Sequence, residues 1–170
     1  MFSKASLLVA SAATLVFIAS AHAQNPRGAA EVSVGGKKVD IDYGRPSLKG
    51  RDMLGEAPVG TVWRTGADSS TTFTTETDLA LGGKTIAAGS YSLFTKRVDD
   101  KTWHLIFNTQ TGQWGTTHDA SLDLTEVPLT WEQGSSSVEQ FTIEMSDSSG
   151  GGEMKMLWGT HILKLDLKAK

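Results

Sequence analysis

The residues EVSVGGKKVDIDY (31–43) decide the class of fold that this chain adopts. Apolar side chains recur at every second position on both sides of Gly35-Gly36. A two-residue period is typical of a half-buried β-strand, and a glycine pair between two such runs favours a tight hairpin turn. We therefore expect an antiparallel hairpin that ends near Pro46, because proline has no backbone N–H to give to a strand ladder.

The same alternation returns through the rest of the chain, in short runs that glycine pairs and polar turns separate. No segment has a helical period long enough to build a βαβ unit. The pattern predicts an all-β fold of about nine or ten strands. Uneven strand lengths and two long loops favour an antiparallel β-sandwich, jelly-roll-like in topology, over a closed barrel.

The first 23 residues have the features of a secretory signal peptide. Lys4 supplies a positive charge, residues 7–18 are mostly apolar, and Ala21-His22-Ala23 is a small-x-small cleavage site. The apolar run is shorter than the ~20 residues that span a bilayer, so we expect no membrane span in the mature chain. The expected organisation is a cleaved signal peptide at 1–23, a short N-terminal tail at 24–29 and a single all-β domain at 30–170. The expected location is periplasmic or secreted.

Composition narrows the classes of function that remain. Cleavage would leave 147 of the 170 residues, enough for one domain with a sizeable core, and the absence of cysteine excludes disulfides and thiol chemistry. The mature chain has 15 basic and 19 acidic residues, and residues 102–170 hold only 4 of the basic ones. A phosphate-backbone binder needs clustered positive charge, so nucleic acid is not an expected partner.

The stretch VWRTGADSSTTF (62–73) holds the densest run of chemically useful side chains. If Trp63 enters the core of a strand, Arg64 points the other way, and the glycine at 66 allows a turn that brings Asp68 back. Two interpretations are open. Arg64 and Asp68 form a pair that orders the turn while Arg51 ties down the preceding loop, or the two guanidiniums present fork-like donors to a polar ligand.

A second candidate feature is the long loop of residues 109–119. It holds Trp114 two residues from Gly112 and next to Gly115, in an otherwise polar segment. A tryptophan in such a loop either stacks on a planar ligand or folds down over the sheet edge. The candidate ligand-binding residues are therefore Arg51, Arg64, Asp68, Thr71 and Trp114.

The sequence lacks residues that several familiar catalytic motifs require. The run Gly82-Gly83-Lys84-Thr85 copies the end of a phosphate-binding loop, but Asp78 stands where that pattern needs its first glycine. No Gly-x-Ser-x-Gly elbow occurs. No catalytic residue is assigned and no cofactor is expected.

Two hydrolytic alternatives depend on how the chain folds. The histidines at 104, 118 and 161 lack the spacing of zinc ligands, so a metal site of His104, His118 and His161 requires the fold to assemble it. The parity of His161 with the leucines that follow it favours a hydrogen-bonded histidine at the core rim. Paired carboxylates among Asp68, Asp119 and Glu144 are the other alternative, whose separation the sequence does not give.

Five blocks in order resemble the bacterial domain-of-unknown-function family numbered 2911. They are RPSLKGR (45–51), VWRTGA (62–67), 79–84, 88–94 and QWG (113–115), and the likeness spans most of residues 30–167. The resemblance implies an exported bacterial β-rich domain without an established activity. The family often places tyrosine and aspartate after the Trp-Gly pair, whereas this chain has His118-Asp119, so His118 is a poor basis for a mechanism.

The leading hypothesis is an exported, non-enzymatic module that binds a small polar ligand, a glycan or an envelope component. The alternatives are a hydrolase acting on envelope material through carboxylates or a histidine metal site, and a purely structural domain. Each of these hypotheses gives the same candidate residues a different role.

Overall fold

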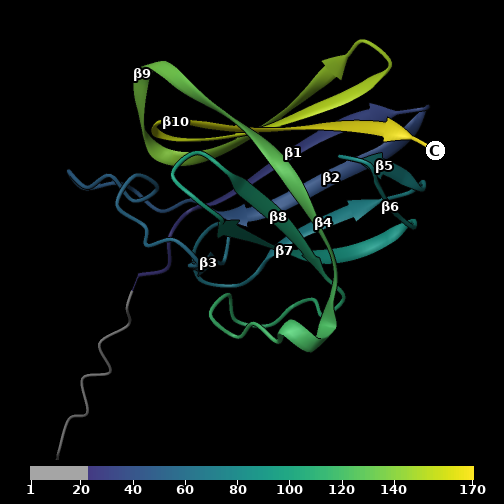
Figure 1. Ribbon diagram of the computed structural model, residues 1–170. Helices are drawn as coiled ribbons and strands as arrows, with labels where there is room; N and C mark the ends of the chain where they lie inside the picture. Colours follow the sequence, from purple (N-terminus) through teal and green to yellow (C-terminus); the bar gives the residue numbers. More distant parts are fainter. Residues whose placement is uncertain (1–22) are drawn as a thin grey trace, which may run out of the picture.

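The computed structural model describes residues 23–170, which form an antiparallel all-β fold (Figure 1). A short 3-10 turn, η1 (Ala120–Leu122), precedes the longest strand. The strands are β1 (Arg27–Val34), β2 (Lys37–Gly44), β3 (Val62–Trp63), β4 (Thr71–Thr75), β5 (Leu79–Leu81), β6 (Lys84–Ile86), β7 (Gly89–Arg97), β8 (Trp103–Asn108), β9 (Asp123–Ser148) and β10 (Gly151–Ala169). The prediction of an all-β antiparallel fold with about nine or ten strands is confirmed.

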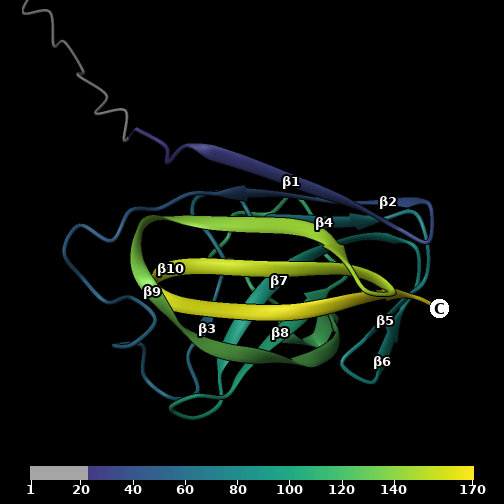
Figure 2. The same ribbon diagram turned by 90° about the horizontal axis from the view of Figure 1, so that it is seen from above.

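The strands follow one hydrogen-bonded order, β1-β2-β4-β7-β8-β9-β10-β5-β6. The short strand β3 lies off this order and pairs with the C-terminal end of β7. Strand β9 belongs to both layers, because residues 123–129 pair with β8 and residues 130–148 pair with β10. Figures 1 and 2 show β9 leaving the layer of β8 and passing over it together with β10. The sandwich is therefore one sheet folded over at β9. Its strand order follows chain order except for the β5-β6 hairpin, which docks on the end of β10.

Strand β10 keeps an apolar face toward the core along its whole length because of a bulge at Gly159. Buried side chains occupy even positions before it, such as Met156 and Trp158, and odd positions after it, such as Leu163 and Leu165. The register with β9 shifts on both sides of Gly159, whose φ is 63°. An extra residue in one strand reverses the facing of everything that follows, and glycine adopts this backbone conformation without a Cβ penalty.

The core lies between the two layers. One layer contributes buried side chains from β1, β2, β4, β7 and β8, among them Phe73 and Phe107, and the other contributes Phe141 and Met156. The expected turns are present, since Gly35-Gly36 joins β1 to β2 and Gly82-Gly83 joins β5 to β6. These alternating patterns predicted their strands because each has one buried and one exposed face.

Strand β1 begins at Arg27, inside the segment that the sequence suggested as a tail. The predicted signal peptide at 1–23 lies outside the described residues except for Ala23. Within residues 23–170, no helix has both the length and the apolar character needed to cross a membrane.

Candidate functional site

The central motif has an unusual backbone between β3 and β4. Thr65 and Asp68 have φ values of 52° and 62°, and Gly66 lies between them at 155°. A positive φ is uncommon for any residue with a side chain and is a genuine outlier for a β-branched one such as threonine. Strain of this kind persists only where neighbouring groups fix it, and it is concentrated at functional sites.

Three side chains hold the strained turn in place. The Thr71 hydroxyl donates to the carbonyl oxygen of Thr65 at 2.7 Å, and the hydroxyls of Thr65 and Thr95 lie 2.6 Å apart. All three threonines are buried. The carboxylate of Asp68 accepts from the backbone N–H of Asn25 at 2.6 Å and from its side-chain amide at 3.2 Å. Asp68 therefore ties the N-terminal segment to the turn, and the Arg64–Asp68 pair suggested by the sequence is not formed.

The loop between β8 and β9 packs against this turn (Figure 1). The backbone N–H of Gly115 donates to the carbonyl oxygen of Asp68 at 2.8 Å, and that of Ser70 donates to Gln113 at 2.9 Å. A Cβ added to Gly115 would lie 2.7 Å from Cδ of Arg64. The glycine is thus required for the loop to close over the arginine.

The turn and the loop enclose a pocket of about 330 Å³, which we call the Arg64 pocket. Its apolar walls come from β3 and β7, and its polar groups come from Arg64, directly after β3, and from the loop. The lining residues are Val62, Trp63, Arg64, Phe94, Gly115, Thr116 and His118. Arg64 is partly buried, and its guanidinium makes no hydrogen bond or ion pair within residues 23–170. An arginine fork with no carboxylate partner is available to an anionic ligand.

His118 also lines the Arg64 pocket, and its orientation is fixed. Its Nε2 lies 2.9 and 3.1 Å from the two carboxylate oxygens of Asp123, which also accepts from the buried side chain of Asn108 at 2.7 Å. The imidazole packs on Phe94 with ring centroids 4.3 Å apart. Because Nε2 faces Asp123, Nδ1 is the ring nitrogen left for other contacts.

Trp63 is also a wall of a second pocket, the tryptophan cavity, of about 390 Å³. Trp103 and Trp158 form its other aromatic walls, and the loop of residues 51–58 closes it. The guanidinium of Arg97 donates to the carbonyl oxygens of Leu54, Gly55 and Ala57 and lies 5.7 Å from the centroid of the Trp103 ring. This single side chain fixes the loop to the sheet.

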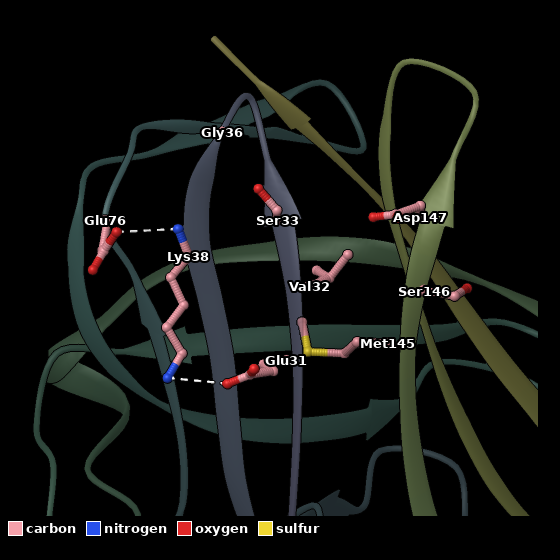
Figure 3. A pocket seen from close by; sticks show the side chains of 9 residues that line it. All are labelled: Glu31, Val32, Ser33, Gly36, Lys38, Glu76, Met145, Ser146 and Asp147. Atoms are coloured by element: carbon pink, nitrogen blue, oxygen red, sulfur yellow. Dashed lines mark hydrogen bonds and ion pairs between the residues drawn. The ribbon is translucent and has the colours of Figure 1, made fainter.

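A further hollow, of about 560 Å³, lies between β1 and the end of β9 (Figure 3). Its lysine is paired with the acidic side chains around it. Lys38 Nζ lies 3.1 Å from Glu31 and 3.4 Å from Asp40, and the Lys38 backbone N–H donates to Glu76 at 3.1 Å. The hydrogen bond to Glu31, together with the negative charges of Glu31 and Asp40, raises the pKa of Lys38. Glu31, Glu76 and Asp147 outnumber Lys38 among the lining side chains, so this open hollow is an acidic sheet edge that does not suit an anionic ligand.

The structure divides the five predicted ligand-binding residues between two places. Arg64 lines its own pocket, Asp68 and Thr71 support the turn behind it, and Arg51 lies at the tryptophan cavity. The backbone of Trp114 bridges to Ser69, but its side chain is 47% exposed and is not a wall of the Arg64 pocket. The ligand-binding role of all five stays a prediction.

Other residues of the two pockets were missed as ligand contacts at the sequence level. Phe94 and Thr116 gave no signal, since one follows a strand pattern and the other lies in a polar loop. His118 was considered only as a metal ligand. The one available indication for His118 was its position, three residues beyond the Trp-Gly pair.

The three histidines lie in three separate pairs with carboxylates. His104 pairs with Glu126 at 3.1 Å and His118 with Asp123, while His161 lies 3.0 Å from Asp52 and accepts from the indole N–H of Trp131 at 3.0 Å. His161 is thus a hydrogen-bonded histidine at the rim of the core. Within residues 23–170, no group of three or more histidine or carboxylate side chains is arranged to hold a metal ion.

Two of the three carboxylates considered for hydrolysis are held by structural hydrogen bonds, and the third is exposed away from both pockets. Asp68 binds Asn25, and Asp119 accepts from the backbone and hydroxyl of Ser121 at 2.9 and 2.7 Å. The hydrogen bond from the Ser121 hydroxyl, followed by that from its backbone N–H, lowers the pKa of Asp119 below its ordinary value. Glu144 is exposed on β9 and lines neither pocket.

Together these features define an all-β module with two preformed pockets that share one tryptophan. The chain belongs to a family of proteins of unknown function, DUF2911, whose family model matches residues 25–167. This confirms the resemblance carried by the five sequence blocks. No curated protein and no solved structure matches the chain.

Proposed function

We propose that this protein is an exported, non-enzymatic module that binds a small anionic ligand in the Arg64 pocket. The observation that carries the proposal is the partly buried guanidinium of Arg64, which lines a pocket and has no partner within residues 23–170. A guanidinium with no carboxylate partner among these residues keeps its donors free for an anion. A carboxylate or phosphate in the pocket would supply the counter-charge and accept the two parallel hydrogen bonds that the fork offers.

The surrounding structure supports a binding role because it fixes the arginine before any ligand arrives. The strained backbone at Thr65 and the glycine at 115 both serve to set the position of Arg64. An arginine whose backbone and aliphatic part are held in this way has less conformational freedom to lose on binding.

Pocket size and chemistry limit the ligand. A volume of about 330 Å³ lies near the small end of the range for small-molecule sites. The Phe94 and Trp63 walls suit a compact apolar or sugar-ring face, while Arg64 suits an acidic group. Small carboxylates, phosphates and sugar acids from envelope material fit this description.

Export is part of the same proposal, and its basis is the leader-like sequence at 1–23. The mature protein is expected to begin at Gln24 and to work in the periplasm or outside the cell. Intact mass of the exported protein tests this. A species that retains Met1 would contradict it.

The binding test uses the mature protein and a panel of acetate, phosphate, sulfate and glucuronate, with glucose as the neutral partner of glucuronate. Backbone amide spectra recorded during titration should shift at Arg64, Gly115 and Thr116 with at least one of the anions. Glucose should shift them less than glucuronate. If no member of the panel shifts these amides at concentrations on the order of tens of millimolar, where even weak sites fill, the proposal fails.

A further inference from the structure

We infer that the tryptophan cavity is a second binding site, for small planar aromatic carboxylates. Nothing in this inference depends on the Arg64 pocket, although Trp63 borders both. Four features of the cavity carry it: its volume, its flat aromatic walls, an unpartnered indole N–H and an arginine at its rim.

The volume and walls fit a ring system. An apolar cavity of roughly 150 Å³ holds benzene, and this cavity measures about 390 Å³. Trp63 and Trp158 are nearly parallel, with an interplanar angle of 19° and centroids 5.2 Å apart, and Trp103 adds a third indole. Met53 and Leu54 line the loop side of the cavity. Flat apolar walls favour a planar guest over a bulky one.

Two polar groups beside these walls lack partners. Trp158 is only 3% exposed, and its Nε1 has no hydrogen-bond acceptor within residues 23–170. Buried indole N–H groups usually find a partner, so this donor in the wall of the cavity is an unmade hydrogen bond that a small shift of the wall would open to a guest. Arg51 donates from Nε to the carbonyl oxygen of Leu48 at 3.2 Å, while its two terminal nitrogens make no contact with a carboxylate of the described chain.

The cavity is preformed because Arg97 anchors its loop wall. Three carbonyl oxygens of that loop accept from one guanidinium nitrogen of Arg97, whose side chain is 11% exposed. A wall held in this way does not collapse into the empty space. The arrangement suits a ring inside the cavity and a carboxylate at its mouth, where Arg51 is exposed to solvent.

The test is a titration with 2-naphthoate, paired with 2-naphthalenemethanol as a neutral analogue of the same shape. The chain has five tryptophans, so the indole N–H signals report on the cavity and supply their own controls. The signals of Trp63, Trp103 and Trp158 should shift saturably, and those of Trp114 and Trp131 should not. Uniform shifts of all five indoles, or no saturable shift, would overturn the inference.

Three variants locate the site. Arg51→Met should weaken 2-naphthoate about tenfold and leave the neutral analogue unchanged, since it removes only the charge-assisted contact. Ala57→Leu should fill the cavity and abolish binding of both probes while the protein stays folded, as judged by its melting temperature. Arg64→Met should leave the saturable shifts of Trp103 and Trp158 unchanged, because neither tryptophan lines the Arg64 pocket. Unchanged binding by Ala57→Leu, or equal losses of both probes in Arg51→Met, would contradict the assignment.

Discussion

Gly115 lies against the side chain of Arg64 so closely that a Cβ on the glycine would sit 2.7 Å from the arginine Cδ and 2.8 Å from the carbonyl oxygen of Asp68. One neighbour is a backbone atom, so Gly115→Ala cannot be accommodated by moving a flexible side chain alone. We expect it to destabilise the fold by about 1–3 kcal/mol, as overpacking does, and to displace Arg64. Chemical unfolding and anion titration measure the two effects.

Gly134→Ala is the matched control for this substitution. The nearest atoms to an added Cβ at Gly134 are 3.4 Å away, within ordinary van der Waals contact. It should leave anion binding unchanged and alter stability little. Equal behaviour of the two alanine variants would show that close packing at Gly115 does not matter.

The hydroxyl of Thr71 stabilises the strained turn through the Thr65 carbonyl oxygen, 2.7 Å away. Thr71→Val keeps the shape of the side chain but leaves that buried carbonyl without this donor, at a cost of about 1–3 kcal/mol. Thr72→Val, one residue along β4 on the other face, should cost much less. Urea unfolding measures the free energy of unfolding of both variants. A loss in Thr72→Val as large as that in Thr71→Val would contradict the role of the Thr71 hydroxyl in stabilising the turn.

Trp63 and Trp114 should behave oppositely when each is cut back to alanine. Trp63 packs edge-on against Phe141 at 4.9 Å and stacks on Trp158, so its loss should cost about 3–5 kcal/mol. Trp114 is 47% exposed, and Trp114→Ala should change the melting temperature very little. A large loss of stability in Trp114→Ala would mean that its loop supports the core.

The Asp52 carboxylate gives a pH dependence whose direction follows from its contacts. Burial by itself raises the pKa of Asp52, but hydrogen bonds from the Gly55 N–H and from His161 lower it below its ordinary value of about 3.9. A lowered pKa contributes stability above that ordinary value, and the contribution is lost as the pH falls through the folded-state pKa. The melting temperature of Asp52→Asn should therefore fall less than that of the native protein between pH 5 and about pH 2.5. If the melting temperatures of the native protein and Asp52→Asn fall in parallel with pH, the Asp52 carboxylate does not contribute this stability.

The sequence predicted the strands well where one face is buried and the other exposed. The β1-β2 hairpin and the β5-β6 turn follow directly from alternation and glycine pairs. The full length of β9 could not be predicted, because the polar stretch from Glu132 to Ser137 breaks the apolar pattern. The first two residues of that stretch, Glu132 and Gln133, pair with Ile162 and His161 of β10, a tertiary contact that no local pattern shows.

The site was predictable only in part, for a similar reason. Local spacing identified Trp63 and Arg64 and placed them on opposite faces, but it paired Arg64 with Asp68, whose actual partner is Asn25. Asn25 is 43 residues away in sequence, so the contact depends on how the strand order brings β1 beside the turn. Arg51 was grouped with Arg64 for the same lack of tertiary information, although the two line different pockets.

The most direct test of the central claim is calorimetric titration of the tightest-binding panel anion into native protein, Arg64→Lys and Arg64→Met. Lysine keeps the charge but loses the planar fork, whereas methionine loses both. We predict that Arg64→Lys binds about tenfold more weakly, that Arg64→Met shows no measurable binding, and that all three proteins have similar melting temperatures. Equal affinity of the three proteins for the anion would contradict the claim that Arg64 receives the ligand.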